Sequence, residues 1–310
     1  MHSIICVVGP TASGKTALAV ELAKLYNGEV ISCDSMQIYR RMDIGTAKPT
    51  AEEMQGIVHH MIDVVEPTED FSVSRYCEMA DPILQDVLAR GKTAIICGGT
   101  GLYVDALIRG GDFAPTPSTG CREKLERRAE QEGIGALLAE LTAIDPEAAD
   151  RSQGNPRRII RALEVWQETG ETITQHNKRT QAIPPKYKAA WLAIDYVNRK
   201  TLYDRIDLRV ELMVQQGLLD EIRALLAEGI PEKATALQAI GYKEFVDALA
   251  GRDTVESAIA RLQQASRRYA KRQLTWFKRN PQVHWIRRED HTTAEEIILQ
   301  ARRFLEDFDN

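Results

Sequence analysis

The chain has 310 residues, 44% hydrophobic and 27% charged, which is typical of a globular protein large enough to need no disulfide or metal staple. Its formal net charge of −5 excludes a globally basic, histone-like protein but is compatible with a local basic face. It has no apolar run of 18 residues, so we predict no membrane-spanning helix. The first residues lack the basic segment and cleavage site of a signal peptide, so none is expected.

Short apolar runs of strand length alternate with helical stretches over the first hundred residues. Residues 3–8, 29–33 and 93–97 are continuous runs rich in Ile, Val and Cys, and 58–65 is a further candidate strand. Apolar residues recur at helical spacing between them, as in 16–25. Strands that are apolar throughout and separated by helices predict a parallel sheet covered on both faces.

A helical block then interrupts the sheet pattern. Residues 113–120 are rich in Pro, Thr and Gly and are typical of a linker, and 122–170 shows helical spacing without a strand-like run. Within this block, Asp145-Pro146 and Asn155-Pro156 each predict the start of a helix, with Pro in or near its first turn. A second linker at 182–188 precedes a strand at 189–194. The predicted domains are a core of residues 1–112 and 188–310 and an all-helical insertion of residues 113–187.

The remainder of the chain is mostly helical and locally basic. A long helix is predicted over 254–279 and a short strand over 283–286. From Ser257 to Arg288 the sequence contains nine Lys or Arg and no Asp or Glu, which indicates an anion-binding face suited to RNA. The aromatic residues Tyr269 and Trp276 lie seven positions apart within it and are expected to face inward.

The cysteines and the paired histidines are interpreted as structural. The five cysteines are odd in number and form no C-x-x-C pair, which argues against a zinc site. Cys6, Cys33 and Cys97 lie in strand-like runs, so we expect core residues in a reducing compartment, the cytoplasm. His59 and His60 are adjacent on a candidate strand and would point to opposite faces.

One motif carries clear chemistry. The segment GPTASGKT matches G-x-x-x-x-G-K-[ST] between a predicted strand and a predicted helix, which is the context that a phosphate-binding loop requires. Backbone N–H groups and the helix N-terminus would cradle phosphate oxygens, the lysine would add a charge, and the threonine hydroxyl could bind Mg²⁺. The predicted diphosphate-binding residues are Gly9, Pro10, Thr11, Ala12, Ser13, Gly14, Lys15 and Thr16.

The motif indicates polyphosphate binding but not which polyphosphate. The strand at 93–97 ends in glycines and Thr100, without the carboxylate that a nucleotide hydrolase places there. Asp34 instead follows the second strand, where ligands bind in such sheets, and could act as a general base. The alternative is that Asp34 caps a helix or stabilises a turn.

Two arginines are candidates for further phosphate contacts. Arg205 and Arg209 lie one helical turn apart and could face one site, and Arg209 is favoured as a cation on the diphosphate. The alternative is a solvated or salt-bridged surface beside the neighbouring Asp204 and Asp207. A small-molecule or nucleotide kinase and a nucleotide-switched RNA-binding protein both remain compatible with the loop.

A series of strings resembles one family. GPTASGKT, ISCDSMQIYR, DIGTAKP, GGTGLYVDAL, RRIIRALEV, IGYKE and YAKRQLTWFKR follow in the order found in tRNA dimethylallyltransferases, and the resemblance runs from Ile5 to about Arg279. It implies an α/β fold: a P-loop NTPase-like parallel sheet flanked by helices, with an all-helical insertion domain. It also implies transfer of a dimethylallyl group from dimethylallyl diphosphate to N6 of the adenosine 3′ of the anticodon, in tRNAs reading codons that begin with U.

The resemblance further implies roles for individual residues. Asp34 would accept the N6 proton, Thr100 would contact the substrate, Arg209 would bind the diphosphate, and Thr16 would hold Mg²⁺. The partners would be dimethylallyl diphosphate and the anticodon stem-loop of tRNA, bound by a monomer. The implied tRNA-binding residues are Asp34, Ser35, Met36, Gln37, Thr100, Arg122, Arg157, Arg158, Ile159, Ile160, Arg161, Gln238, Ala239, Ile240, Gly241, Tyr242 and Lys243.

The chain departs from the family pattern at one loop of the insertion. Gly154-Asn155-Pro156 stands where the family has Asn-Asp-Pro, which removes a charge. Asn155 can still cap the helix that follows.

Overall fold

The computed structural model describes residues 4–110 and 119–309 and divides into two compact units. The core unit comprises Met1–Ile108 and Tyr187–Asn310, and the insertion unit comprises Arg109–Lys186. The predicted domain boundary at residue 112 lies outside the described residues, as does the predicted linker 113–120 except for its last two residues. Within the described ranges, no helix is long and apolar enough to cross a membrane.

The core unit is built on one six-stranded sheet in the order β3-β2-β4-β1-β5-β6, with every neighbouring pair parallel. The predicted parallel sheet is therefore confirmed. Val8 pairs with Gly98 and Ser32 with Cys97, so the segments that follow β1, β2 and β4 meet at one edge. The strands are β1 (Ile4–Val8), β2 (Gly28–Ser32), β3 (His59–His60), β4 (Thr93–Gly98), β5 (Ala190–Tyr196) and β6 (Val283–Arg288).

The predicted strand at 58–65 is longer than the observed one, since only His59–His60 forms a strand, β3. Met61 and Asp63 adopt positive φ angles, which end the extended conformation. Val65 returns to a single parallel bridge with Tyr39.

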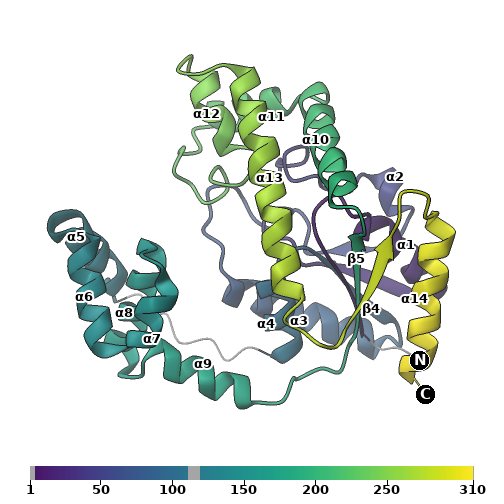
Figure 1. Ribbon diagram of the computed structural model, residues 1–310, viewed down its shortest axis with the longest axis horizontal. Helices are drawn as coiled ribbons and strands as arrows, with labels where there is room; N and C mark the ends of the chain where they lie inside the picture. Colours follow the sequence, from purple (N-terminus) through teal and green to yellow (C-terminus); the bar gives the residue numbers. More distant parts are fainter. Residues whose placement is uncertain (1–3, 111–118, 310) are drawn as a thin grey trace. The chain divides into compact units, whose positions relative to one another are not determined.

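Helices cover both faces of the sheet (Figure 1). On one face Leu18 and Leu22 of α1 pack with Leu305 of α14, and on the other Leu84 of α3 and Val104 of α4 share a core with the end of α13. Each fully buried Leu or Val contributes roughly 1.5–3 kcal/mol. The core helices are α1 (Lys15–Leu25), α2 (Ala51–Met54), α3 (Val73–Ala89), α4 (Gly101–Arg109), α10 (Arg199–Gln215), α11 (Leu218–Ala227), α12 (Lys243–Leu249), α13 (Val255–Phe277) and α14 (Ala294–Asp309).

A separate hydrophobic cluster joins α10–α13 to the segment that follows β2. Tyr39 and Met42 of that segment pack against Val210, Ile222 and Phe245 in this cluster. The contact places the residues after β2 opposite the helices of the C-terminal half.

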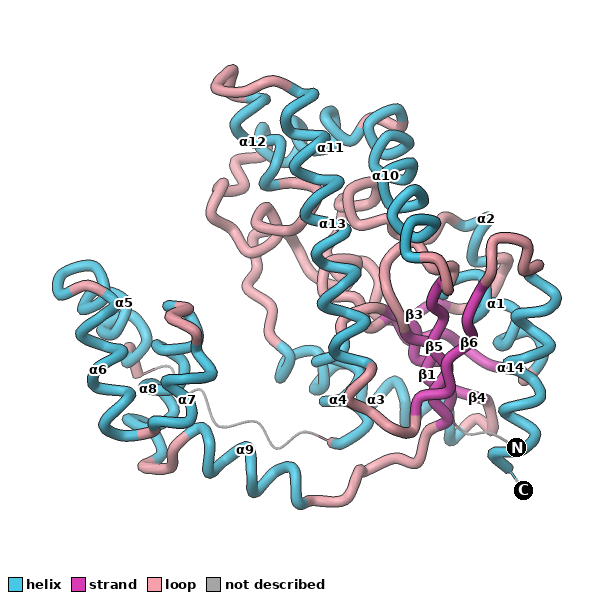
Figure 2. Tube along the Cα trace, viewed as in Figure 1, coloured by secondary structure: helices cyan, strands magenta, loops and turns pink. Residues whose placement is uncertain are grey.

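The insertion unit contains helices only over its described residues (Figure 2). Two of them begin as predicted, because Asp145 accepts a hydrogen bond from the N–H of Ala148 and Asn155 from that of Arg158, with Pro next in each case. Asn155 therefore does cap its helix. The helices are α5 (Cys121–Glu132), α6 (Ile134–Ile144), α7 (Pro146–Ser152), α8 (Pro156–Thr169) and α9 (Ile173–Ala182).

Candidate active site

The loop from Gly9 to Thr16 connects β1 to α1 at the edge where the strands end. Gly9 and Gly14 have φ angles of +133° and +95°, in the region that favours glycine. A Cβ at Gly9 would lie 2.7 Å from the carbonyl oxygen of Ile194. The first turn of α1 begins at Lys15, so its free N–H groups face the loop, as an anion cradle requires.

Gln273 of α13 fastens this loop to the end of β4. Its Oε1 accepts a hydrogen bond from the N–H of Thr11 at 2.8 Å, and its Nε2 donates to the carbonyl oxygen of Gly99 at 3.0 Å. Gln273 is buried, and its bond to Gly99 is shielded from water. Gln273 was not predictable as a site residue from the sequence, because a single amide in a basic helix carries no recognisable pattern.

Both candidate arginines of α10 reach the loop. Arg205 Nε donates to the carbonyl oxygen of Ala12 at 3.2 Å, and Arg209 Nη1 donates to the hydroxyl of Thr11 at 3.4 Å. Among the described residues, neither arginine forms an ion pair with Asp204 or Asp207. The acidic neighbours on α10 pair elsewhere, in the ion pairs Asp204–Lys200 and Asp207–Arg267.

A cavity of about 590 Å³ opens beside the loop. Apolar side chains of α10 and α13, among them Val210, Met213 and Leu262, form part of its wall. The predicted residues that line it are Thr11, Ala12, Ser13, Gly14, Lys15, Thr16, Asp34, Ser35, Met36, Gln37, Arg209, Gln238, Ala239, Ile240 and Lys243. The predicted core residues outside its lining are Gly9, Pro10, Thr100, Gly241 and Tyr242.

Lys15 lines this cavity. Its Nζ donates to the carbonyl oxygen of Pro10 at 2.6 Å. Burial, with a smaller contribution from Arg209, lowers the pKa of Lys15 to about 8. A bound anion would stabilise the charged ammonium, so the environment of Lys15 favours a negatively charged ligand.

Asp34 combines a structural and a potential chemical role. Its Oδ1 accepts hydrogen bonds from the N–H groups of Met36 at 2.9 Å and Gln37 at 3.4 Å, so Asp34 does stabilise a turn. Within the described part of the chain, Oδ2 accepts no hydrogen bond and is available to a ligand. Burial raises the pKa of Asp34, against the opposing effect of the Met36 N–H. A carboxylate with one free oxygen and a raised pKa suits proton acceptance.

Thr100 stands behind the segment that carries Asp34. Its Oγ1 accepts a hydrogen bond from the N–H of Ser35 at 3.1 Å and lies 3.3 Å from the Ser35 hydroxyl. Thr100 therefore fixes Ser35, a cavity residue, rather than lining the cavity itself.

Gln37, another cavity residue, is held from two sides. Ser32 Oγ donates to its Oε1 at 3.2 Å, and its Nε2 donates to the carbonyl oxygen of Ala47 at 3.1 Å.

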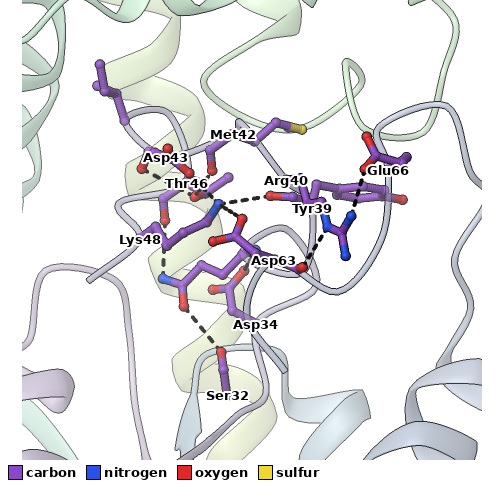
Figure 3. Close-up of polar contacts among 12 residues, drawn as sticks. Ser32, Asp34, Tyr39, Arg40, Met42, Asp43, Thr46, Lys48, Asp63 and Glu66 are labelled. Atoms are coloured by element: carbon purple, nitrogen blue, oxygen red, sulfur yellow. Dashed lines mark hydrogen bonds and ion pairs between the residues drawn. The ribbon is translucent and has the colours of Figure 1, made fainter. Parts of the chain in front are cut away.

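A buried lysine orders the segment that forms the adjacent wall (Figure 3). The Lys48 side chain is 6% exposed and lies between the carboxylates of Asp43 and Asp63, with a further hydrogen bond of 2.9 Å to the carbonyl oxygen of Tyr39. Three separate parts of the segment are thus tied to one ammonium group. The role of Lys48 was not predictable from the sequence, since its partners are 5, 9 and 15 residues away without periodicity.

Glu221 of α11 holds the same segment from the other side. Its Oε2 accepts hydrogen bonds from the N–H groups of Asp43 and Ile44 at 2.8 Å each, and its Oε1 accepts from Gly45 N–H at 3.1 Å and the Tyr242 hydroxyl at 2.6 Å. Tyr242 is fully buried, so the structure places this predicted tRNA-binding side chain in the protein core. A Cβ at Gly45 would lie 2.5 Å from its ring.

The predicted residues of the insertion unit differ in their surroundings. Arg122 and Arg161 both pair with Glu164, at 2.8 Å and 2.7 Å, and the Glu164 side chain is 4% exposed. Ile159 and Ile160 are buried in the unit's hydrophobic core. These four residues stabilise the insertion.

Arg157 and Arg158 lie on the insertion surface. Arg157 is exposed, and Arg158 is also exposed and donates to the carbonyl oxygen of Arg151 at 3.1 Å. Their side chains carry positive charge to solvent without a carboxylate partner in the described residues.

The basic C-terminal helix has an inner and an outer face. Tyr269 lines the cavity and Trp276 donates to Asp105 at 2.8 Å, so both aromatic residues do face inward. The exposed cations of α13 are Arg261, Arg268, Lys271 and Arg272, of which Arg272 also lines the cavity, and Lys278 and Arg279 follow the end of the helix. Cys6 and Cys33 are core residues as predicted, whereas Cys97 is half-buried and lines the cavity.

A parallel sheet, a glycine-bounded loop opening into a helix, and a lysine at its base define a P-loop protein of the α/β class. The sequence profile of the IPP transferase family matches residues 37–280, and that of the isopentenyl transferase family matches residues 2–67. The chain belongs to the IPP transferase family.

Relatives and solved structures agree with this assignment. The chain is 46% identical over 297 residues to the tRNA dimethylallyltransferase of Caldanaerobacter subterraneus subsp. tengcongensis, covering 95% of this chain and 94% of the relative. It is similar to the crystal structure of the tRNA isopentenylpyrophosphate transferase from Bacillus halodurans, with 42% identity, a TM-score of 0.75 and coverage of 99% and 96%. It also resembles a eukaryotic dimethylallyltransferase acting on tRNA, with 27% identity, a TM-score of 0.83 and coverage of 99% and 80%.

Proposed function

We propose that this protein transfers the dimethylallyl group of dimethylallyl diphosphate to N6 of the adenosine 3′ of the anticodon in tRNAs that read codons beginning with U. The observation that carries the proposal is that Lys15, Arg209 and Asp34 face one cavity. The cations suit a diphosphate and the carboxylate suits an amine that must lose a proton. Family membership and relatives named tRNA dimethylallyltransferases support the same reaction.

The reaction exchanges one bond for another. The C1–O bond of the allylic diphosphate breaks and its electron pair leaves with pyrophosphate, while N6 of adenine forms a new bond to C1. The N6 proton then passes to the free Oδ2 of Asp34. Since an allylic carbon ionises readily, the main tasks of the protein are to stabilise pyrophosphate and to place the adenine.

The phosphate loop performs the first task. Its N–H groups and the N-terminus of α1 would face the diphosphate oxygens, and Lys15 and Arg209 would neutralise the charge that builds on the leaving group. The apolar wall of the cavity, including Val210 and Met213, would accommodate the hydrocarbon part of the donor.

Mg²⁺ fits the donor set beside this loop. The described residues contain no cluster of three His, Cys, Asp or Glu side chains that could enclose a metal ion. The Thr16 hydroxyl lines the cavity and would hold Mg²⁺, whose other ligands would be diphosphate oxygens and water, in the manner this ion prefers. The ion would supply positive charge to the leaving pyrophosphate.

The acceptor would be the anticodon stem-loop of tRNA. The target adenosine must leave the base stack to reach the cavity, and Gln37, Gln238 and Lys243 lie in its wall, where they could bind unstacked base edges. Arg157 and Arg158, which are exposed on the insertion unit, would bind the phosphate backbone. One monomer would serve one tRNA, in the cytoplasm.

A nucleoside analysis tests the proposal. Protein, Mg²⁺ and unmodified tRNA with three adenosines on the 3′ side of the anticodon are incubated with dimethylallyl diphosphate or, in parallel, with ATP. The digested nucleosides are then weighed by mass spectrometry. We expect an adenosine heavier by one isopentenyl unit with the diphosphate alone. Release of ADP from ATP without this product would indicate a kinase instead.

A further inference from the structure

We propose that Arg288, acting with Arg205 across the ring of Tyr196, is a positioning residue that holds the phosphate loop in its anion-binding conformation. This inference rests on the proposed function, because it concerns the same diphosphate. Arg288 is not part of the cavity lining, so it would act through the loop rather than on the substrate.

Arg288 is the last residue of β6 and lies against the loop. Its Nη1 donates to the carbonyl oxygen of Ser13 at 3.3 Å. A Cβ added to Gly14 would lie 3.2 Å from the same Nη1, so the guanidinium lies directly beside the second loop glycine. Its Cζ is 5.1 Å from the ring centroid of Tyr196, the β5 residue paired with Arg288 in the sheet.

Arg205 repeats this arrangement one residue earlier in the loop. Its Cζ is 5.7 Å from the same Tyr196 ring centroid, and its Nε donates to the carbonyl oxygen of Ala12 at 3.2 Å. One aromatic ring therefore supports two guanidinium groups, which bind the carbonyl oxygens of two consecutive loop residues.

The planarity of the peptide bond connects these two hydrogen bonds to phosphate binding. In a trans peptide, the carbonyl oxygen of one residue and the N–H of the next point in opposite directions. Holding the carbonyl oxygens of Ala12 and Ser13 toward the arginines therefore directs the N–H groups of Ser13 and Gly14 away from them. Those N–H groups belong to the residues that line the cavity.

The charges around Arg288 also favour an anionic ligand. Among the described residues, no carboxylate pairs with Arg288 or Arg205. Arg288 Nε, Ser13 Oγ and the Tyr196 hydroxyl are buried polar atoms that have no hydrogen-bond partner there. Since a partly buried cation without a counterion is unfavourable, a nearby diphosphate would relieve this positive charge.

The test uses substitutions of Arg288 in the full-length enzyme, with the exposed neighbour Arg287 as a matched control. We expect Arg288→Gln to raise both the KM for dimethylallyl diphosphate and the Kd of inorganic pyrophosphate about tenfold, since one charge and one loop contact are lost. Arg288→Lys retains the charge and should restore part of this loss. The kcat and the Kd for tRNA should stay within about threefold, and Arg287→Gln should leave the KM for dimethylallyl diphosphate and the Kd of pyrophosphate near the wild-type values.

Two results would overturn the inference: equal KM and Kd values in Arg288→Gln and Arg287→Gln, or a fall in kcat with unchanged diphosphate binding. If Arg288→Gln does not fold, Arg288→Lys decides, with a rise of about threefold expected and no rise contradicting the inference. The proposed function is tested separately by the wild type. Prenyl transfer by the wild type with normal binding by the Arg288 variants would refute the positioning role alone, whereas a wild type that binds no pyrophosphate would refute both.

Discussion

Clusters of arginine occur in both units, and their surroundings differ. At the phosphate loop, Arg205 and Arg288 donate to backbone carbonyl oxygens and have no carboxylate partner in the described residues. In the insertion unit, Arg122 and Arg161 share the buried carboxylate of Glu164. The first set leaves positive charge available to a ligand, and the second uses it within the protein. The number of arginines in a segment therefore does not define their role, whereas the partners of each do.

The largest expected effect is a loss of catalysis from a substitution in the cavity beside the phosphate loop. Asp34→Ala should lower the rate of prenyl transfer by about 10²–10⁴-fold, because the N6 proton loses its acceptor. Asp34→Ala should lose little affinity for tRNA. The loss should be much smaller than the loss of diphosphate affinity in Lys15→Ala. Single-turnover transfer and equilibrium binding measure the two effects. Near-normal turnover by Asp34→Ala would show that Asp34 is not the base.

A substitution at the ion pairs of the insertion unit should change stability instead of catalysis. Glu164→Gln would leave Arg122 and Arg161 without their buried counterion and should destabilise the insertion unit by roughly 3 kcal/mol. Hydrogen exchange of peptides from α5 and α8 would report this loss. Arg151, whose ion pair with Glu147 is largely exposed, offers a control in Arg151→Gln, with an effect below about 1 kcal/mol. Equal effects of the two substitutions would contradict the structural role of Glu164.

The contribution of Glu164 should also depend on pH. Burial raises the pKa of Glu164, but hydrogen bonds from Arg122 and Arg161 outweigh it, and the net shift is downward. A carboxyl with a lowered pKa in the folded state stabilises the fold above its ordinary pKa and loses that contribution as the pH falls through the folded value. The stability difference between wild type and Glu164→Gln should therefore be constant near neutral pH and shrink in acid. A difference that grows in acid would contradict this sign.

Asp34 should show the opposite shift. Burial raises its pKa, so it binds a proton at a higher pH than an ordinary aspartate. The acid limb of the kcat/KM profile should therefore lie above pH 4, with activity falling about tenfold per pH unit below that limb. A profile that stays flat down to pH 4 would contradict the assignment.

The smallest effect is expected at the insertion surface. Arg157→Gln should weaken tRNA binding about threefold and reduce its salt dependence by about one counterion, because an exposed cation contacts one phosphate. The thermal stability should not change. Arg122→Gln is the comparison variant: it should lower the stability of the insertion unit and leave the salt dependence of tRNA binding nearly unchanged. A larger loss of salt dependence in Arg122→Gln than in Arg157→Gln would contradict the roles assigned to these two residues.

The sequence predicted most of what depends on neighbouring residues. The strands, the phosphate loop and the capped starts of α7 and α8 follow from local apolar runs, glycines and the Asn-Pro and Asp-Pro pairs. The spacing of Arg205 and Arg209 placed them on one side of a helix but left their partners open. The order of the strands was not predictable, because it depends on pairing between distant segments.

The residues that fasten the site escaped prediction for the same reason. Gln273 contacts a residue 262 positions away, Arg288 one 275 positions away, and Glu221 one 178 positions away. Each is a single polar residue in an otherwise ordinary helix or strand, so no local pattern distinguishes it. The phosphate-binding loop could therefore be predicted from its local sequence, whereas the residues that hold it in place could be identified only in the folded structure.

The most direct test of the central claim counts both products of one reaction. Pyrophosphate and prenylated adenosine are quantified together in a single-turnover experiment with dimethylallyl diphosphate, with and without tRNA. The account predicts one pyrophosphate released for each adenosine modified, and release that requires tRNA. Pyrophosphate release without a modified adenosine, or consumption of ATP in place of the allylic diphosphate, would contradict it.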